Sequence, residues 1–422
     1  MKLQKIVSRL QKLHPKEIDL SLDRIKTLCN KLGNPQDKIK AISIIGTNGK
    51  YSTTQALFSI LKEANFKCNI YTSPHIKKIN ERFVFNNKEL NDEELAKLFE
   101  EVEEINQKLP ITFFEILTAA YFYKASKYPS NINLIEAGLF HRFDATNILK
   151  QNLASIITSI SLDHLDWLPK NEQKIERIVF EKTSSLLNSK IIIAKQNSKK
   201  VIRCIKKNIS SNLSKKLFFG EDYNYSSTEK KFFHFEDKFG KLKLPMPNLL
   251  GQFQLENVST AIATLRILSE LNVKENHIKY GIVKINNIAR LQEIKSGKLK
   301  NLVKNNKLLV DGSHNEDGSR VLNQYLQSLN CNKHVIIGMM ANKDHIKYMN
   351  YFKRISSITT IDIPNQPNSI SGKKLKEKLN NFPNIKYKKN IKEAIKSVDL
   401  KNQDLLIITG SLYLAGEVLN LN

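Results

Sequence analysis

The chain has few cysteines and no long apolar run, and both absences limit what kind of protein it can be. Its cysteines, Cys29, Cys68, Cys204 and Cys331, are widely spaced and form no CxxC pair, so neither a zinc ribbon nor a disulfide framework is indicated. No apolar stretch approaches the roughly 18 residues that a membrane helix needs, and the N-terminus lacks the apolar block of a signal peptide. We therefore expect a cytoplasmic protein in a reducing compartment, without a membrane partner.

Acidic residues are also in short supply. The chain has 41 Asp and Glu against 67 Lys and Arg, which gives a net charge of +26. Such a charge can indicate nucleic-acid binding, because basic side chains neutralise phosphates. Here the basic residues are spread along the chain, and aromatic residues do not alternate with them as a base-stacking platform requires. We interpret the charge as composition bias that attracts anionic small molecules, and expect no specific nucleic-acid partner.

The order of apolar runs predicts an α/β protein. A chain of 422 residues is too long for one ordinary core, so we expect two domains, divided after residue 288. Strand-like runs alternate with helical patterns, which predicts mostly parallel sheets covered on both faces. The predicted strands lie at 41–45, 69–72, 132–136, 154–160 and 190–194, and a second series follows at 307–313, 333–340, 358–364 and 404–411. A short hairpin is predicted near 230–245.

Each of several predicted strands ends at a distinctive polar group. In open parallel sheets, ligands bind beyond the carboxyl ends of the strands. The groups in question are Gly46 to Lys50, Ser73 to His75, Glu136, Asp163 with His164, and Asp311 to Asn315. One such group is ordinarily a loop without function, but five at corresponding strand ends indicate a binding edge.

The first of these groups has the chemistry to bind phosphate. A strand, a glycine turn and a helix N-terminus point backbone N–H groups at one place, and Lys50 adds a full positive charge. Ser52 or Thr53 can offer a hydroxyl to Mg²⁺. The strict Walker pattern is not met, because Ile44 stands where it has its first glycine. Ser73, Glu136 and His164 form a plausible Mg²⁺ site, although histidine is an unusual magnesium ligand and commonly has a hydrogen-bonding role.

Eight motifs then occur in one order: GTNGKxS, YTSPHIKKINERF, TFFE, EAGLxxRxDATN, TSISLDHLDWL, EK, DGSHN and ITGSLYLAGEV. Over nearly its whole length the chain resembles the folylpolyglutamate synthase family, the bifunctional dihydrofolate synthase/folylpolyglutamate synthases of the Mur ligase superfamily. The resemblance implies a P-loop-containing Mur-ligase-type ATPase domain with the pteroate/folate site at 1–288, and a smaller Rossmann-like glutamate-ligase domain at 289–422.

The implied activity is that of an ATP-dependent ligase. A dihydropteroate or folate carboxylate attacks the γ-phosphorus of ATP, and the amine of L-glutamate then attacks the acyl phosphate. Two Mg²⁺ ions, a cytoplasmic location and a monomer belong to this expectation. Positioning and charge neutralisation carry phosphoryl transfer of this kind, and water must be kept from the intermediate.

Site residues follow from the resemblance, motif by motif. Lys50, Lys182 and His164 are expected to be catalytic. The expected ATP contacts are Thr47, Asn48, Gly49, Lys50, Ser52, Asn257, Arg290, Asp311 and His314. The expected metal ligands are Ser52, Ser73, Glu136 and His164. The expected pteroate or folate contacts are Ile18, Asp19, Leu20, Thr112, Phe113, Phe114, Glu115, Asp144 and Ala145. A flat heterocycle stacks well on phenyl rings, although core packing is the alternative for one of the two phenylalanines.

Lys182 matches a family lysine that CO₂ carbamylates, a reaction that needs a neutral amine and hence a lowered pKa. The chain also departs from the family at several positions. Tyr51, Phe140 and His141 stand where the family has glycine, and EKTSSL replaces EKAGI. If position 51 has a positive φ, the tyrosine costs roughly 1–2 kcal/mol.

Two alternatives remain at this point. The chain can be another Mur-type ligase, although TSPHIKKINERF together with DATN disfavours this. It can also be a degenerate relative that binds a nucleotide or a nucleic acid, which the lost glycines and the net charge would support. The retention of all the proposed phosphate and metal residues argues against degeneration.

Overall fold

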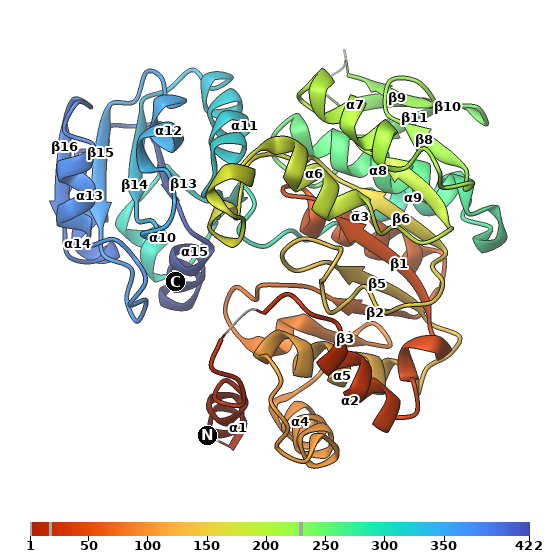
Figure 1. The fold of residues 1–422 in the computed structure, drawn as a ribbon. Helices are drawn as coiled ribbons and strands as arrows, with labels where there is room; N and C mark the ends of the chain where they lie inside the picture. The colour runs from red at the N-terminus through yellow and green to blue at the C-terminus, as the bar shows by residue number, and fades with distance from the viewer. Residues whose placement is uncertain (1, 17–18, 228–230) are drawn as a thin grey trace. The chain divides into compact units, whose positions relative to one another are not determined.

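The fold is shown in Figure 1 as a computed structural model, which describes residues 2–16, 19–227 and 231–422. The chain forms two compact units. The first comprises Met1–His164, Leu168–Asn248 and Leu255–Ile285, and the second comprises Leu165–Trp167, Leu249–Gln254 and Asn286–Asn422. The sequence-based division after residue 288 stays a prediction about the folding domains.

An eight-stranded sheet forms the centre of the first unit. Its strands are β1 (Lys40–Ile45), β2 (Cys68–Tyr71), β3 (Phe83–Phe85), β4 (Lys88–Glu89), β5 (Ile132–Glu136), β6 (Ala154–Ile157), β7 (Lys190–Ile193) and β8 (Lys216–Phe218). Their order is β4-β3-β2-β5-β1-β6-β7-β8. The strands that pair in parallel are, in spatial order, β2, β5, β1, β6, β7 and β8. Strands β3 and β4 add an antiparallel edge beside β2. Every residue of β5 is buried, as expected for a sheet covered on both faces.

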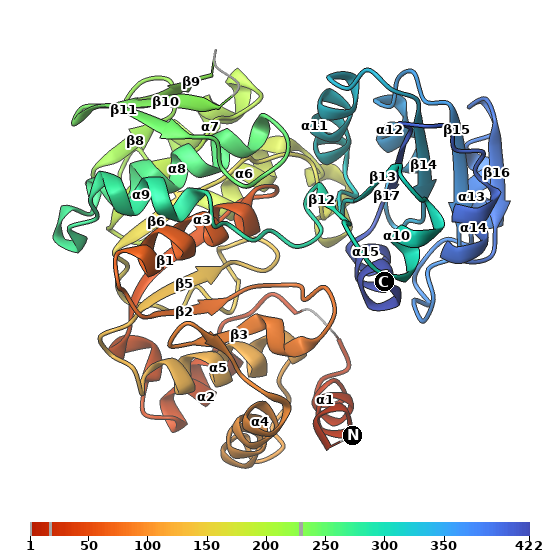
Figure 2. The same ribbon diagram turned by 180° about the vertical axis from the view of Figure 1, so that it is seen from behind.

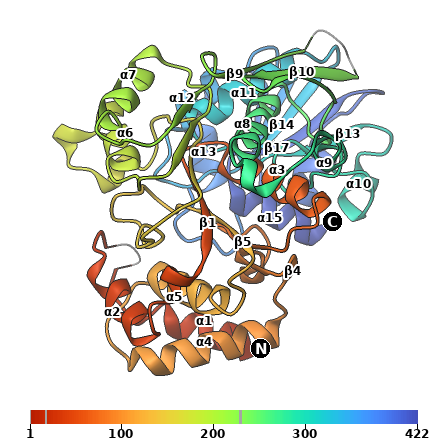
Figure 3. The same cartoon turned by 90° about the vertical axis from the view of Figure 1, so that its right-hand side faces the viewer.

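Helices cover this sheet. They are α1 (Lys2–Leu10), α2 (Asp23–Lys31), α3 (Lys50–Glu63), α4 (Asp92–Asn106), α5 (Phe113–Ala125), α6 (Ile175–Thr183), α7 (Lys199–Asn208), α8 (Phe253–Ile267) and α9 (Glu275–Ile282). Figure 2 shows α3, α8 and α9 on one side of the sheet, and Figure 3 shows α6 and α7 on the other. In Figure 3, α1, α2, α4 and α5 gather beside one another. This group packs around an apolar cluster that includes Leu10, Ile25, Phe99 and Tyr121.

The polar residues that begin these helices explain where they start. Asn91 caps α4, because its side chain accepts hydrogen bonds from the backbone N–H groups of Glu93 and Glu94. Thr112 caps α5 and forms a reciprocal capping box with Glu115. The TFFE motif is therefore, in the first place, a helix start.

A small antiparallel sheet also belongs to the first unit. It consists of β9 (Tyr223–Ser226), β10 (Phe232–Asp237) and β11 (Gly240–Pro245). The hairpin predicted near residues 230–245 corresponds to β10 and β11. Short 3₁₀ turns complete the connections of the chain: Pro35–Lys38, Ile79–Arg82, Leu165–Trp167, Lys170–Glu172 and Ser269–Leu271.

The second unit is a smaller α/β layer structure. Its strands are β12 (Gln292–Glu293), β13 (Lys307–Val310), β14 (Lys333–Ile337), β15 (Ser357–Ile361), β16 (Ile385–Lys388) and β17 (Leu405–Thr409). Their order is β12-β13-β17-β14-β15-β16, and all pairings are parallel except that of β12. Its helices are α10 (Lys298–Leu302), α11 (Glu316–Gln327), α12 (His345–Asn350), α13 (Gly372–Lys378), α14 (Ile391–Ser397) and α15 (Leu412–Leu421).

The eight-stranded and the six-stranded sheet, both mostly parallel and accompanied by helices, confirm the α/β fold class predicted from the sequence. Among the described residues, the helices are too short or too polar to cross a bilayer.

Candidate active site

The segment between β1 and α3 is a glycine turn that is fastened to the segment after β6. The backbone N–H groups of Thr47 and Asn48 donate to the carbonyl of Ser159 at 2.8 and 3.1 Å. The Thr47 hydroxyl donates to the carbonyl of Ser161 at 3.1 Å. These bonds fix the turn in front of the N-terminus of α3, where partial positive charge gathers.

Two glycines in this turn are required by its geometry. Gly46 has a φ of +150°, and a Cβ there would lie 2.0 Å from the Thr158 hydroxyl. Gly49 has a φ of +91°, and a Cβ there would lie 2.5 Å from the side-chain oxygen of Asn257. The structure thus brings together Gly49 and Asn257, two of the predicted ATP contacts, from distant parts of the chain.

Tyr51 lies in the first turn of α3 and is not among the residues with positive φ. The position therefore accepts any helical residue, and the tyrosine stands there without backbone strain. The turn needs no glycine at position 51, because the special conformations fall on Gly46 and Gly49.

Two lysines converge on one carbonyl oxygen of the turn. The Nζ of Lys50 lies 3.0 Å from the oxygen of Gly46, and the Nζ of Lys182 lies 3.0 Å from the same oxygen. Lys182 also donates to the carbonyl of Leu139 at 2.9 Å, so it spans the glycine turn and the loop after β5. Lys50 therefore places a positive charge at the turn, directly beside the Lys182 amine.

Lys182 is almost fully buried in α6. Burial and, secondly, the nearby Lys50 lower its pKa to about 7, against the opposite effect of Asp163 and Asp144. At neutral pH a large fraction of Lys182 is therefore uncharged, as few lysines are.

Glu136, the last residue of β5, lies beside the N-terminal half of α3. Its side chain is 1% exposed, and its carboxylate accepts a hydrogen bond from the Thr54 hydroxyl at 3.1 Å. The other carboxylate oxygen is 3.5 Å from the backbone nitrogen of Ser73. Ser52 is buried in the first turn of the same helix. Glu136 and Ser73 are thus neighbours, as the metal prediction requires.

His164 has a φ of +57°, an uncommon conformation for a side-chain-bearing residue. Its backbone N–H donates to the Asp163 carboxylate at 2.9 Å, and its Nε2 lies 4.0 Å from the same group. Within the described residues no three His, Cys, Asp or Glu side chains form a metal-binding group. A magnesium ion here would therefore take its remaining ligands from hydroxyls, phosphate oxygens and water, as nucleotide-bound magnesium commonly does.

The loop after β5 is organised by Asp144. One carboxylate oxygen accepts hydrogen bonds from the N–H groups of Gly138 and Leu139 at 2.9 and 3.1 Å. The other accepts from the backbone and the hydroxyl of Thr146 at 3.0 and 2.6 Å. Burial raises the Asp144 pKa, while these hydrogen bonds oppose the shift. Asp144 therefore shapes the loop that carries it and Ala145.

Phe140 and His141, where the resemblance led us to expect glycines, are buried. The Phe140 ring lies 5.6 Å from the Lys182 Nζ. Burial and the neighbouring Lys182 lower the His141 pKa to about 3, so this histidine is neutral. Both side chains are therefore shielded from solvent.

Sequence reasoning missed Glu181, which ties this loop to α6. Its buried carboxylate accepts two hydrogen bonds from Arg142, at 2.9 and 2.8 Å, and pairs with Arg177 at 2.7 Å. Its carbonyl accepts the N–H groups of His141 and Arg142. The motif letters EK and R contained this pair, but their contact is visible only in the fold.

The predicted pteroate residues lie around the start of α5. Phe113 and Phe114 are half-buried and pack against the apolar cluster of the first unit. Phe114 stacks on Tyr71 with ring centroids 6.0 Å apart, and its ring would lie 2.8 Å from a Cβ at position 138. Leu20 is 37% exposed. Ile18 lies outside the described residues.

The predicted ATP residues of the second unit also lie close together. The Asp311 carboxylate accepts the N–H groups of Leu291 and Ser313 at 2.8 and 2.9 Å. A guanidinium nitrogen of Arg290 would lie 3.0 Å from a Cβ at Gly312, and His314 Nδ1 lies 2.9 Å from the Gly312 carbonyl. Arg290, Asp311 and His314 thus share one strand end.

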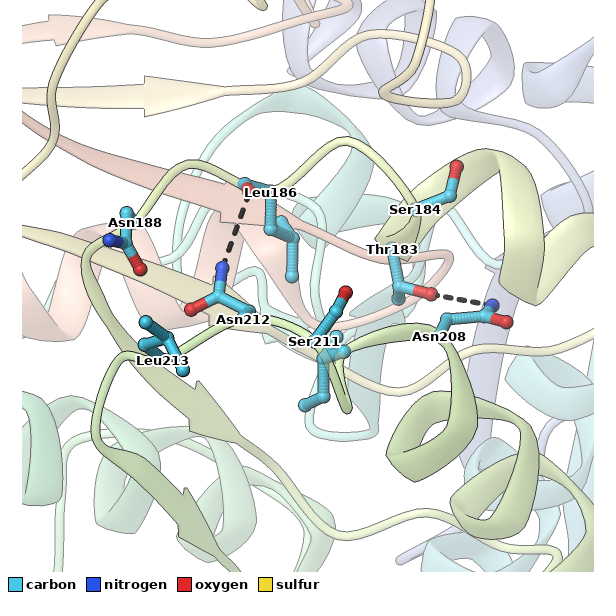
Figure 4. Close-up of a pocket in the computed structure, with 9 residues that line it drawn as sticks. Thr183, Ser184, Leu186, Asn188, Asn208, Ser211, Asn212 and Leu213 are labelled. Atoms are coloured by element: carbon cyan, nitrogen blue, oxygen red, sulfur yellow. Dashed lines mark hydrogen bonds between the residues drawn. The ribbon is translucent and has the colours of Figure 1, made fainter.

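A separate pocket of about 300 Å³ lies where α6 and α7 end. Figure 4 shows its lining, which is made of neutral side chains: Thr183, Ser184, Leu186, Asn188, Asn208, Ile209, Ser211, Asn212 and Leu213. No charged group among them would hold a phosphate or a carboxylate, so we do not assign the substrates to it.

A parallel sheet, a glycine turn at a helix N-terminus and a lysine pair together define a P-loop-type, phosphate-binding α/β protein. The family model for the Mur ligase middle domain matches residues 44–265 of this chain. The model for the Mur ligase, glutamate ligase domain, matches residues 298–412. The chain therefore belongs to the Mur ligase family.

Relatives cover nearly the whole chain. It is 29% identical to dihydrofolate synthase/folylpolyglutamate synthase of Escherichia coli (98% of this chain, 94% of the relative). It is 27% identical to the protein of that name in Bacillus subtilis, with 94% of each covered. The structure of E. coli FolC in complex with DHPP and ADP aligns with a TM-score of 0.86 at 28% identity, covering 99% of this chain and 97% of that one. The Yersinia pestis bifunctional synthase with AMPPNP and a Mn ion aligns with a TM-score of 0.86 at 25% identity and the same coverage.

Proposed function

We propose that the protein is an ATP-dependent ligase that adds L-glutamate to dihydropteroate, to folates, or to both. The observation that carries the proposal is the meeting of Lys50 and Lys182 on the Gly46 carbonyl, between a glycine turn and the loop of Asp144. Relatives over nearly the full length bear the names of this activity. The domain ranges 1–288 and 289–422 are part of the proposal.

In the first step, the acceptor carboxylate attacks the γ-phosphorus of ATP and ADP leaves, which forms an acyl phosphate. In the second step, the glutamate amine attacks the acyl carbon, phosphate leaves, and the nitrogen loses a proton. Lys50 and the N-terminus of α3 supply positive charge where the phosphate charge develops. Asn257, Arg290, Asp311 and His314 are proposed to hold the nucleotide.

The metal sites are proposed for Ser52, Ser73, Glu136 and His164, with two magnesium ions in all. The buried Glu136 carboxylate and the hydroxyls are oxygen donors of the kind that magnesium prefers. A bound divalent ion would neutralise charge on the phosphates. The Yersinia pestis structure with AMPPNP and a Mn ion supports a divalent metal.

Lys182 is the proposed site of carbamylation. Its lowered pKa of about 7 supplies the neutral amine that CO₂ requires. Its Nζ donates to two carbonyls, whereas a carbamate nitrogen keeps one hydrogen, so modification would release one of these contacts. A ¹³C NMR spectrum after ¹³CO₂ addition, compared with that of Lys182→Met, tests for the carbamate.

The pteroate or folate is proposed to contact Asp19, Leu20, Thr112, Phe113, Phe114, Glu115, Asp144 and Ala145. A cytoplasmic monomer acting on ATP, L-glutamate and the pteroate or folate acceptor completes the proposal.

The test is an ADP-release assay with Mg²⁺, first with dihydropteroate and glutamate and then with tetrahydrofolate and glutamate. We expect release that depends on both substrates, and at least about a hundredfold loss of kcat in Lys50→Ala and Glu136→Ala. Lys62→Ala, which removes an exposed lysine at the far end of α3, is the matched control and should keep wild-type activity. Undiminished activity in both site variants would refute the assignment.

A further inference from the structure

Arg24, in α2, joins two predicted acceptor-binding residues that are far apart in the sequence. Its Nη1 lies 3.0 Å from the Asp19 carboxylate, and its Nη2 donates to the Asp19 carbonyl at 2.8 Å. Its Nε donates to Glu115 Oε2 at 3.0 Å. One planar guanidinium therefore holds the N-terminal segment against the start of α5.

Only one of the two carboxylate oxygens of Glu115 has hydrogen-bond partners in the described part of the chain. Its Oε2 accepts hydrogen bonds from Arg24 and from the backbone N–H of Thr112, at 3.0 and 2.8 Å. Its Oε1 is buried and has no hydrogen-bond partner in the described part of the chain. Glu115 itself is 4% exposed. A buried carboxylate oxygen without a donor is costly, which indicates that a further donor belongs at this position.

Asp19 differs from Glu115 in its surroundings. Its side chain is 35% exposed, and His14 Nε2 lies 3.7 Å from its carboxylate. The half-exposed Asp19 is thus held by its contacts with Arg24, and not by burial of its own side chain.

We propose that Arg24 is a positioning residue of the acceptor site, which holds Asp19 and Glu115 so that Glu115 Oε1 receives an N–H group of the acceptor's heterocycle. The inference deepens the proposed function and rests on it. An amino-substituted fused ring of the pteroate type carries N–H donors of this kind. The guanidinium suits the role because its donors lie in a fixed plane, whereas a lysine offers one point charge.

The experiment measures KM and kcat of Arg24→Met and Arg24→Lys with dihydropteroate and with ATP. We expect about tenfold or greater increases in KM for dihydropteroate in both variants, with the KM for ATP within about twofold of wild type. Glu115→Gln should raise the same KM, because an amide oxygen at position 115 accepts a hydrogen bond less strongly than a carboxylate oxygen. The substitution leaves Thr112 and the helix start in place.

Arg9→Met is the matched control. Arg9 makes a similar two-point contact with Glu103, with its Nε 2.7 Å from Oε1, but the pair joins α1 to α4 and involves no predicted site residue. Arg24→Met leaves the buried Glu115 charge without its guanidinium, so the variant can lose stability. The double variant Arg24→Met/Glu115→Gln removes that charge and should recover the melting temperature but not the KM.

The outcomes separate this inference from the proposed function. A dihydropteroate KM in Arg24→Met equal to that in Arg9→Met, with an active wild type, overturns the role of Arg24 and leaves the ligase assignment standing. Equal losses for dihydropteroate and ATP also overturn it, since they indicate a general loss of structure. A wild-type protein that binds ATP but uses no pteroate or folate acceptor overturns both.

Discussion

At the residue scale, the main result is that one carbonyl oxygen collects two lysines. Lys50 could be assigned from the glycine turn and helix that surround it. Lys182 could be assigned only from the resemblance, because an isolated lysine in a helix is ordinarily a surface residue. Its burial and its distance from Gly46 depend on how α6 packs, which no local pattern encodes.

The buried Lys182 amine should make stability depend on pH. Its pKa is about 7 in the folded protein against an ordinary value of 10.5. Between these values the unfolded chain binds a proton that the folded chain does not, so the free energy of unfolding rises with pH. Below pH 7 the folded protein carries the full cost of the buried charge. In CO₂-free buffer, the free energy of unfolding of wild type should increase relative to that of Lys182→Met by up to about 1 kcal/mol per pH unit between pH 7 and 9.

Urea unfolding of both proteins across this pH range measures the difference. Lys62→Met, at an exposed position, corrects for the general effect of losing one charge. A difference between wild type and Lys182→Met that stays constant with pH would show that Lys182 keeps its ordinary pKa.

At the element scale, the sequence predicted the parallel core well. Predicted strands at 41–45, 132–136 and 190–194 correspond to β1, β5 and β7 within one residue at each end. Continuous apolar runs make such strands easy to recognise. The short antiparallel edges, β3 with β4 and β12, were missed, and so were β8, β9 and β16, because strands of two to four residues carry little periodic signal.

The candidate site followed the same division. Residues within the glycine turn could be inferred from local chemistry, because a strand, a turn and a helix are consecutive in the chain. The Glu181 pair with Arg142 and the Arg24 bridge could not, because each joins segments that meet only after folding. The inward direction of Phe140 and His141 likewise depends on the packing of α6.

Glu181→Gln should loosen the loop that Asp144 organises. The change keeps the side-chain shape but removes the charge that Arg142 and Arg177 share, and partly buried ion pairs are costly to break from one side. We expect the free energy of unfolding to fall by about 2 kcal/mol relative to wild type. We also expect the KM for the pteroate acceptor to increase by a larger factor than the KM for ATP.

Chemical denaturation and steady-state kinetics measure the two effects. Glu270→Gln is the control, because Glu270 pairs with Lys190 at 3.0 Å on the surface and such pairs contribute little. Equal stability losses in the two variants, or an unchanged acceptor KM in Glu181→Gln, would contradict the coupling of α6 to the loop.

At the scale of the whole molecule, the two units correspond to the two matched parts of the Mur ligase family, and each contains proposed nucleotide contacts. The fold of each unit is explained by its own buried core and its own sheet order. The property that belongs to the entire chain is its net charge of +26, which neither unit's fold requires.

If this charge attracts substrates, the second-order rate should depend on salt while the chemical step should not. ATP, the pteroate acceptor and glutamate are all anionic, and added salt screens long-range attraction. Raising the ionic strength from about 0.02 to 0.3 M should lower kcat/KM for ATP several-fold and change kcat by less than about twofold.

A DNA titration under the same conditions should show weak binding without sequence preference that disappears with salt. Salt-independent kcat/KM would assign the charge to composition alone, and tight sequence-selective DNA binding would instead favour a nucleic-acid partner.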